Sequence, residues 1–327
     1  MGNSTNNGVG GNVYALVMNG TNQLFVGGSF TSVDGSSILA NNIASWNGNS
    51  WSFLGTNSTN NGVNGTVYAL AMNGTNQLFV GGQFSSANGG SVSANNIASW
   101  DGNSWIFLGA NSTNNGVGVG GSDTVYALAM NGTNQLFVGG RFSSVDGGSI
   151  SANNIASWDG NSWNILGAKS SSNGVNGYVY ALAMNRTNQL FVGGNFFSVD
   201  GNSISANHIA SWNGNSWNFL GSDSINNGVD ARVTALVMNE TNNLLVGGQF
   251  TFFFDSGGST TNANFIASWN GSAWNTLGAN NGVNGNVAAL ASNETAKLYV
   301  GGEFSSTTDG LVCSSFLVSV KGGKNYR

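Results

Sequence analysis

The chain contains no proline and few charged residues: 6 % of its 327 residues are Asp, Glu, Lys or Arg. Average usage is about 25 % charged and about 5 % proline, so a charge-solvated disordered chain, a proline-rich linker and a collagen are excluded. Eight Lys and Arg against 13 Asp and Glu leave a net charge of -5. Because polyanion binding needs clustered cations, nucleic acid is not expected as a partner. The apolar runs have the length of strands and fall short of the ~20 residues of a membrane helix, so no membrane insertion is expected.

Cysteine and histidine are too scarce for several kinds of site. The single cysteine, Cys313, cannot close an intrachain disulfide, so cysteine usage leaves the redox compartment undetermined. The single histidine is His208, and no Ser-His-Asp set, paired carboxylates or Cys/His cluster can be assembled around it. The sequence therefore predicts no metal, no cofactor and no enzymatic activity.

Glycine is abundant, at 51 residues, and it marks an internal repeat. A Gly-Gly pair follows an apolar triplet six times, first at Gly27 and Gly28, with a period of about 54 residues. The whole chain, residues 1–327, is predicted to be one domain. Its repeats span approximately residues 12–55, 66–109, 124–167, 178–221, 232–278 and 286–327.

Each repeat holds four runs of strand length, separated by Gly, Asn, Ser and Asp. Asn73-Gly74 follows the first run of the second repeat and Asp101-Gly102 follows the third, and both pairs predict tight hairpin turns. The first run, Val67 to Met72, alternates small and large apolar side chains. Both faces of such a sheet are apolar and must be covered. All ten Trp occupy two slots of the repeat and are predicted to be core residues.

Sheets that stack the large face of one on the small face of the next satisfy this requirement in a radial array. The predicted fold is therefore all-β, a six-bladed β-propeller of four-stranded antiparallel blades. The last blade is expected to have an incomplete outer strand, because its third strand is Phe316 to Val320 and only Lys324 to Arg327 follows. Met1 to Gly11 matches the loop before a first strand, so we expect closure by face packing, with the last outer edge frayed or capped by Tyr326.

The repeat motif also carries a family resemblance. An apolar triplet before Gly-Gly, then an aromatic residue in the third strand and a Trp in the fourth, resembles the kelch-repeat propellers, including the central domain of galactose-oxidase-like proteins. The variant Gly-Gly-x-Phe followed by Asn-x-Ile-Ala-Ser-Trp is also similar to repeats in large surface proteins of bacteria and fungi. The oxidase activity that the resemblance implies needs copper held by several His and Tyr with a cross-linked Cys. His208 and Cys313 cannot supply these ligands, so that activity does not carry over.

The two ends of each predicted blade differ chemically. One end has short turns that are repeated almost unchanged. The other end, here called the loop-rich end, has the loops after the second and fourth strands, and all length changes fall there, including the longer loop 109–123. Variable loops on a rigid scaffold are common binding sites. One position at this end varies from repeat to repeat, directly after Gly-Gly. It is occupied by Ser29, Gln83, Arg141, Asn195, Gln249 and Glu303.

These six residues are predicted to form a polar, ligand-contacting ring at the mouth of the central channel; the alternative is a solvated position that tolerates any polar residue. A second candidate contact surface is aromatic, formed by Phe197, Phe252, Phe253 and Phe254. The alternative there is that one of the three consecutive Phe fills the core slot of Val33.

His208 replaces an Asn before the third strand and is interpreted as drift at a loop position. Asn-x-Ser/Thr sequons such as Asn73 recur in the first turn of every repeat, either as glycosylation acceptors or as a copied turn sequence.

The favoured function is a non-enzymatic binding scaffold that holds a protein or a glycan on the loop-rich end, expected to be a monomer displayed at an extracellular or particle surface. One alternative is an enzyme with Arg141 and Glu303 as an ionic pair at the channel mouth. Another is a recently duplicated structural repeat protein with no selected ligand. The many asparagines and the missing proline fit an AT-rich genome, such as that of a protist or a large DNA virus.

Overall fold

The computed structural model describes residues 8–168, 173–255, 258–277, 282–293 and 297–305, together with the backbone of 317–320. The chain forms two compact units, Met1–Ile165 and Leu166–Arg327, which are considered separately. Nearly all of the described structure is strand and turn, and the helical element that lies entirely within the described residues is a 3-10 turn, η1 (Asn88–Gly90). No described helix is long and apolar enough to cross a membrane.

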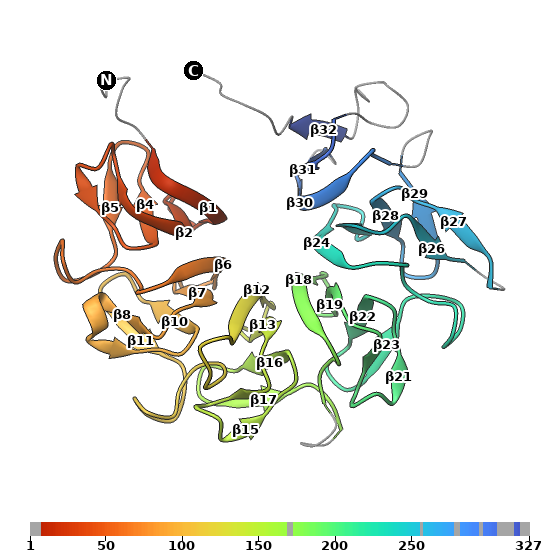
Figure 1. The fold of residues 1–327 in the computed structure, drawn as a ribbon, viewed down its shortest axis with the longest axis horizontal. Helices are drawn as coiled ribbons and strands as arrows, with labels where there is room; N and C mark the ends of the chain where they lie inside the picture. Colours follow the sequence, from red (N-terminus) through yellow and green to blue (C-terminus); the bar gives the residue numbers. More distant parts are fainter. Residues whose placement is uncertain are drawn as a thin grey trace. The chain divides into compact units, whose positions relative to one another are not determined.

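Unit 1 contains the first three repeats, and each forms a four-stranded antiparallel meander (Figure 1). The first repeat has β1 (Val9–Met18), β2 (Leu24–Val33), β4 (Ile43–Trp46) and β5 (Trp51–Phe53). The second has β6 (Thr66–Met72), β7 (Leu78–Gln83), β10 (Ile97–Trp100) and β11 (Trp105–Phe107). The third has β12 (Thr124–Met130), β13 (Leu136–Arg141), β16 (Ile155–Trp158) and β17 (Trp163–Ile165). The expected loop Met1 to Gly11 was wrong in part, since β1 starts at Val9, which pairs with Val33.

Unit 2 contains the last three repeats, of which two form complete meanders. The fourth has β18 (Tyr178–Met184), β19 (Leu190–Asn195), β22 (Ile209–Trp212) and β23 (Trp217–Phe219). The fifth has β24 (Val233–Met238), β25 (Leu244–Gly248), β28 (Ile266–Trp269) and β29 (Trp274–Thr276). The sixth has β30 (Asn286–Ser292), β31 (Leu298–Glu303) and β32 (Leu317–Val320).

The sixth repeat departs from the expected meander because β32 pairs with β31 in parallel. In the complete repeats a Trp at the end of the third strand lies opposite the first Leu of the second strand, as Trp46 lies opposite Leu24. The sixth repeat has no Trp at that point, so it lacks the side-chain pair that sets the antiparallel register elsewhere. The expected outer strand at Lys324 to Arg327, with the Tyr326 cap, lies outside the described residues. Closure of the array involves both units and stays a prediction.

The predicted loops after the second strands contain small hairpins. Four repeats have a two-stranded sheet there: β8 (Ser86–Ala87) with β9 (Val92–Ser93), β14 (Ser144–Val145) with β15 (Ile150–Ser151), β20 (Ser198–Val199) with β21 (Ile204–Ser205), and β26 (Phe252–Phe254) with β27 (Thr260–Asn262). In the first repeat β3 (Ile38–Leu39) pairs with the end of β2. Asp146 and Asp200 turn two of these hairpins with left-handed φ of 54° and 52°. In each unit the loop-rich end therefore carries ordered hairpins.

The Gly-Gly pair is explained by packing between neighbouring repeats. A Cβ on Gly81 would lie 2.5 Å from Cγ1 of Val125 and 3.4 Å from Cδ1 of Leu128, both from the next repeat. A Cβ on Gly82 would collide with the carbonyl oxygen of Thr66, where the register of β6 shifts. The first glycine thus makes room for a Val/Leu pair, and the second allows close approach of two backbones.

The same contact recurs inside both units. Gly27 faces Val67 and Leu70, Gly193 faces Val233 and Leu236, and Gly247 faces Val287 and Leu290. In the first repeat, Val13 and Leu16 occupy the positions of Val67 and Leu70 and are 42 % and 62 % exposed. The prediction of large faces stacked on small ones is confirmed at the junctions within each unit.

The tryptophans of the second to fifth repeats are buried core residues, as predicted, whereas Trp46 and Trp51 of the first repeat are half-buried. Trp100 and Trp105 face each other across β10 and β11 with ring centroids 5.5 Å apart. Nε1 of Trp105 donates to the carbonyl oxygen of Leu54 in the preceding repeat at 3.0 Å. Trp163 does the same to Leu108 in unit 1, and Trp217 and Trp274 do so in unit 2. The indoles therefore tie each repeat to the one before it.

Candidate functional site

The variable position after Gly-Gly lies at the loop-rich end of the second strand, as predicted. Five of its six residues are exposed, and Gln249 is half-buried. In unit 1, Nε2 of Gln83 donates to the carbonyl oxygen of Gly121 at 2.8 Å. In unit 2, Oε2 of Glu303 accepts from Nδ2 of Asn286 at 3.2 Å. The positions are divided between the two units, so the complete polar ring and the pairing of Arg141 with Glu303 stay predictions.

A pocket of about 320 Å³ opens beside Gln83 in unit 1. Its walls come from the second repeat, through Asn64, Ser85 and Asn95, and from segment 118–121 before the third repeat. We call this site the Gln83 pocket. Of the residues predicted to bind a ligand, Gln83 is its only member. Sequence reasoning missed Asn64 and Asn95, because the same Asn recurs in other repeats and there reads as a turn former.

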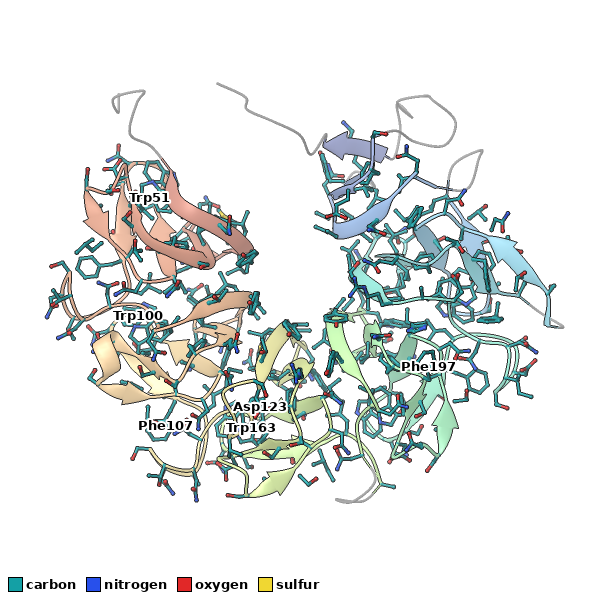
Figure 2. The ribbon with its side chains drawn as sticks, viewed as in Figure 1. Trp51, Trp100, Phe107, Asp123, Trp163 and Phe197 are labelled. Atoms are coloured by element: carbon teal, nitrogen blue, oxygen red, sulfur yellow. The ribbon has the colours of Figure 1, made fainter. Side chains whose placement is uncertain are left out.

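The lengthened loop 109–123 builds the outer wall of this pocket. Oδ2 of Asp123 accepts from the backbone N–H groups of Val119 and Gly120 at 3.0 and 2.8 Å. Asp123 therefore closes the loop on itself ahead of β12, and Figure 2 shows its position in unit 1. Val119, held by this contact, is 71 % exposed at the pocket wall. The predicted importance of this loop rested on its length alone, and the structure adds a defined conformation.

The inner wall is held by amide side chains. Oδ1 of Asn64 accepts from the backbone N–H groups of Ser85 and Ser86 at 2.9 and 3.0 Å, while its Nδ2 donates to Oγ of Ser85 at 3.0 Å. Nδ2 of Asn95 donates to the carbonyl oxygen of Asn115 at 3.2 Å. Gln83 and Asn95 are thus fixed through their amide nitrogens. Their side-chain oxygens can accept hydrogen bonds from a ligand.

No charged side chain lines the Gln83 pocket. The lining offers amide, hydroxyl and backbone groups together with the apolar side chains of Phe84 and Val119. Such a surface can exchange hydrogen bonds with a neutral polar molecule and provides no counter-charge for an ionic one.

The predicted aromatic surface is divided by the structure. Phe253 is 2 % exposed and stacks on Trp274 with ring centroids 5.7 Å apart. It bridges to Val229 in the way that Val199 bridges to Val175, so it fills a core slot. The prediction of Phe253 as a contact residue was therefore wrong. Phe252 and Phe254 point to the other face of the hairpin, half-buried, with ring centroids 5.5 Å apart.

Phe197, labelled in Figure 2, fits the predicted contact surface better. Its side chain is 58 % exposed. Its ring meets the ring of His208 edge to face, with centroids 4.7 Å apart. His208 is 4 % exposed, and burial lowers its pKa, although a backbone hydrogen bond at Gly194 and the charge of Asp230 oppose that shift. His208 lies in the loop before β22, as predicted, and the interpretation of its presence as drift stays a prediction. Among the described residues no group of three or more His, Cys, Asp or Glu is suited to hold a metal ion.

The sequon asparagines of the first turns are structural. Oδ1 of Asn73 accepts from the backbone N–H groups of Thr75 and Gln77 at 3.0 and 2.8 Å, and its Nδ2 donates to Oε1 of Gln77 at 3.3 Å. Asn19, Asn131 and Asn185 make the same set of contacts. These contacts support the interpretation of the sequons as a copied turn sequence.

Comparison with known proteins confirms the fold. A chain of the mitotic checkpoint complex is similar over 90 % of this chain and 72 % of its own length, at 17 % identity and a TM-score of 0.52. PorZ, a surface component of the type-IX secretion system of Porphyromonas gingivalis, matches over 88 % of this chain at 14 % identity and a TM-score of 0.52. This chain spans 37 % of the length of PorZ. A virginiamycin B lyase from Staphylococcus aureus matches over 88 % of this chain and 76 % of its own, at 8 % identity and a TM-score of 0.43.

No protein-family model matches the chain, and no curated protein matches it either. At these low identities the structural matches concern the fold. The repeated four-stranded antiparallel sheets and the two matches with a TM-score of 0.52 show an all-β chain with the β-propeller fold, with a number of blades that fits six or seven.

Proposed function

We propose that the chain is a non-enzymatic binding module that holds a neutral glycan in the Gln83 pocket. The observation that carries this proposal is a pocket of about 320 Å³ with an uncharged lining of amides, the hydroxyl of Ser85 and two apolar side chains. A sugar ring presents hydroxyl groups that exchange hydrogen bonds with amides, and C–H groups that pack on apolar carbon. The pocket is small for a folded protein partner, so a glycan is preferred to a protein here.

Rigidity supports the same proposal. The pocket walls are fixed before any ligand arrives, because Asn64 is hydrogen-bonded to β8 and Asp123 closes the loop that carries Val119. Gln83 then bridges the two repeats through the Gly121 carbonyl. A prearranged site loses little conformational entropy on binding, and this favours recognition of a small flexible molecule.

Two finer assignments belong with this proposal. The kelch-like character of the repeats rests on the Gly-Gly, third-strand aromatic and fourth-strand Trp motif. Display at a surface rests on the resemblance to bacterial and fungal surface repeats. Both agree with a module that presents loops to a ligand from a weakly charged scaffold.

The test is a glycan array probed with the intact chain and with Gln83→Ala. We expect binding of neutral glycans by the intact chain and a loss of about three- to tenfold in affinity for the variant, the size of one neutral hydrogen bond. Gln249→Ala changes the same register position in unit 2 and is the matched control, expected to bind as the intact chain does. Equal affinity of all three proteins, or binding of acidic glycans alone, would contradict the Gln83 pocket.

The non-enzymatic part is tested separately. The glycan that binds most tightly is incubated with the protein and its mass is followed by mass spectrometry. An unchanged mass is expected, and a product that accumulates in proportion to protein concentration would overturn this part.

A further inference from the structure

Only two buried side-chain nitrogen or oxygen atoms of the described residues have no hydrogen-bond partner: Nδ1 of His208 and Nε of Arg232. Both belong to the junction of the fourth and fifth repeats in unit 2. Asn207, next to His208, accepts a hydrogen bond from the backbone N–H of Val229, three residues before Arg232, at 3.2 Å. Buried polar groups without partners are rare, so two at one junction require an explanation.

The same junction concentrates departures from the repeat. Four residues differ in chemical type from their equivalents in the second repeat and at its following junction: Phe197 replaces Ser85, His208 replaces Asn96, Asp230 replaces Asn64, and Arg232 replaces Thr66. We call these four residues the Phe197 junction. Together they introduce an aromatic ring, an imidazole and two charges where the second repeat has small or amide side chains.

His208 changes how this part of the repeat is held. In the second repeat, Oδ1 of Asn96 accepts from the backbone N–H of Phe84 at 3.3 Å, and its Nδ2 donates to the carbonyl oxygen of Val117 at 2.8 Å. His208 packs instead against the ring of Phe197. The outcome is an aromatic side chain more than half exposed on the loop-rich end, supported from below by a buried imidazole.

The charges of the junction are distributed unequally. Oδ1 of Asp230 accepts from the backbone N–H groups of Thr251 and Phe252 at 2.7 and 3.0 Å, and its Oδ2 accepts from Oγ1 of Thr251 at 2.9 Å. Both oxygens of the Asp230 carboxylate therefore accept hydrogen bonds from Thr251 and the first residue of β26. Among the described residues the one ion pair is Arg186 with Glu240, so the half-buried guanidinium of Arg232 has no carboxylate within ion-pair distance. A guanidinium that has no carboxylate partner in the protein can bind the carboxylate of a ligand.

We propose that the Phe197 junction is a second ligand site, which binds the carboxylate of an acidic sugar. The guanidinium of Arg232 binds the carboxylate, and the exposed ring of Phe197, held by the buried imidazole of His208, packs on the C–H face of the sugar. A sugar is preferred to a peptide carboxylate because the neighbouring exposed groups, Asn195 and Thr251, are an amide and a hydroxyl. The site is separate from the Gln83 pocket and does not depend on the function proposed for it.

The test is calorimetric titration of the full chain with D-glucuronate, D-glucose and an N-acetylated dipeptide that has a free C-terminal carboxylate. We expect glucuronate to bind about tenfold more tightly than glucose, the effect of one charge-assisted contact. Glucuronate is also expected to bind more tightly than the dipeptide. Equal binding of glucuronate and glucose, or tighter binding of the dipeptide, would overturn the proposal.

Variants that restore the residues of the other repeats test the assignment without disturbing the fold. Arg232→Thr is expected to abolish the preference for glucuronate over glucose, and Phe197→Ser to weaken both sugars at this site. Arg186→Gln removes a cation from a first turn of the same unit, and Gln83→Ala alters the other pocket; both should keep the preference. If Arg232→Thr also keeps it, or if a crystal soaked in glucuronate shows only ordered water at Nδ1 of His208 and Nε of Arg232, the junction is not a sugar site.

Discussion

Replacement of Gly81 by alanine is the most direct test of the packing between repeats. The added Cβ would lie 2.5 Å from Cγ1 of Val125, roughly 1 Å short of ordinary contact between carbon atoms. Val125 is fully buried and β-branched, so its side chain cannot rotate away without strain. The third repeat must therefore shift away from the second.

The magnitude follows from two opposing terms. Overpacking of a dense interior costs about 1–3 kcal/mol. Replacement of glycine by alanine also lowers the conformational entropy of the unfolded chain, which stabilises the folded state by about 0.4–1 kcal/mol. We expect Gly81→Ala to lower the free energy of unfolding by about 1–2 kcal/mol.

The assay is urea unfolding followed in parallel by tryptophan fluorescence and circular dichroism, so that loss of two-state behaviour would be visible. Gly74→Ala in the same repeat is the matched control, because its Cβ would meet nothing closer than Oδ1 of Asn134 at 3.7 Å. Unfolding of Gly81→Ala at the same urea concentration as Gly74→Ala would refute the explanation of the Gly-Gly pair.

Two further predictions concern the tryptophans and the turns. Trp105→Phe removes the indole donor to the Leu54 carbonyl, which keeps its hydrogen bond from the backbone N–H of Gly62 at 2.7 Å. The variant should therefore lower the free energy of unfolding by about 0.5–1.5 kcal/mol more than Trp51→Phe, whose indole has no such bond among the described residues; urea midpoints measure the difference. Backbone N–H groups of Ser162 and Asn161 lower the pKa of Asp159 to about 2. Because this pKa is lowered in the folded state, its stabilising effect is present above about pH 4 and is lost as the pH falls towards 2. The melting temperature of the intact chain should therefore fall relative to that of Asp159→Asn between pH 4 and 2, and parallel curves would contradict this assignment.

The fold could be predicted from the sequence because the same alternation of apolar residues and the same turn residues recur in each repeat. The alternation from Val67 to Met72 is matched by burial of Val67, Ala69 and Ala71 and partial burial of the residues between them. The reason for the Gly-Gly pair could not be predicted. Its constraint comes from Val125 and the Thr66 backbone, which are close only after folding.

The candidate site was predictable in part. The length of loop 109–123 marks it as unusual in the sequence. The pocket, however, depends on hydrogen bonds of Asp123 and Gln83 that residue spacing in the sequence does not predict. The three consecutive Phe residues could be recognised as unusual, yet which of them faces the core depends on the hairpin register, and Phe253 is the one. The sequence shows His208 only as a replacement for an Asn before the third strand. Its partner Phe197 lies 11 residues earlier and meets it only across the base of a hairpin.

The contact of a Val/Leu pair with the first glycine of the preceding repeat has a direction. The second repeat receives such a pair at Gly81 and delivers its own through Val67, and the fifth repeat does the same at Gly247 and through Val233. A whole repeat inserted at one of these boundaries would find a complementary surface on either side without any change to its neighbours. Chain length can therefore vary in steps of one repeat, while the residues that distinguish one ligand site from another change independently on the loops above.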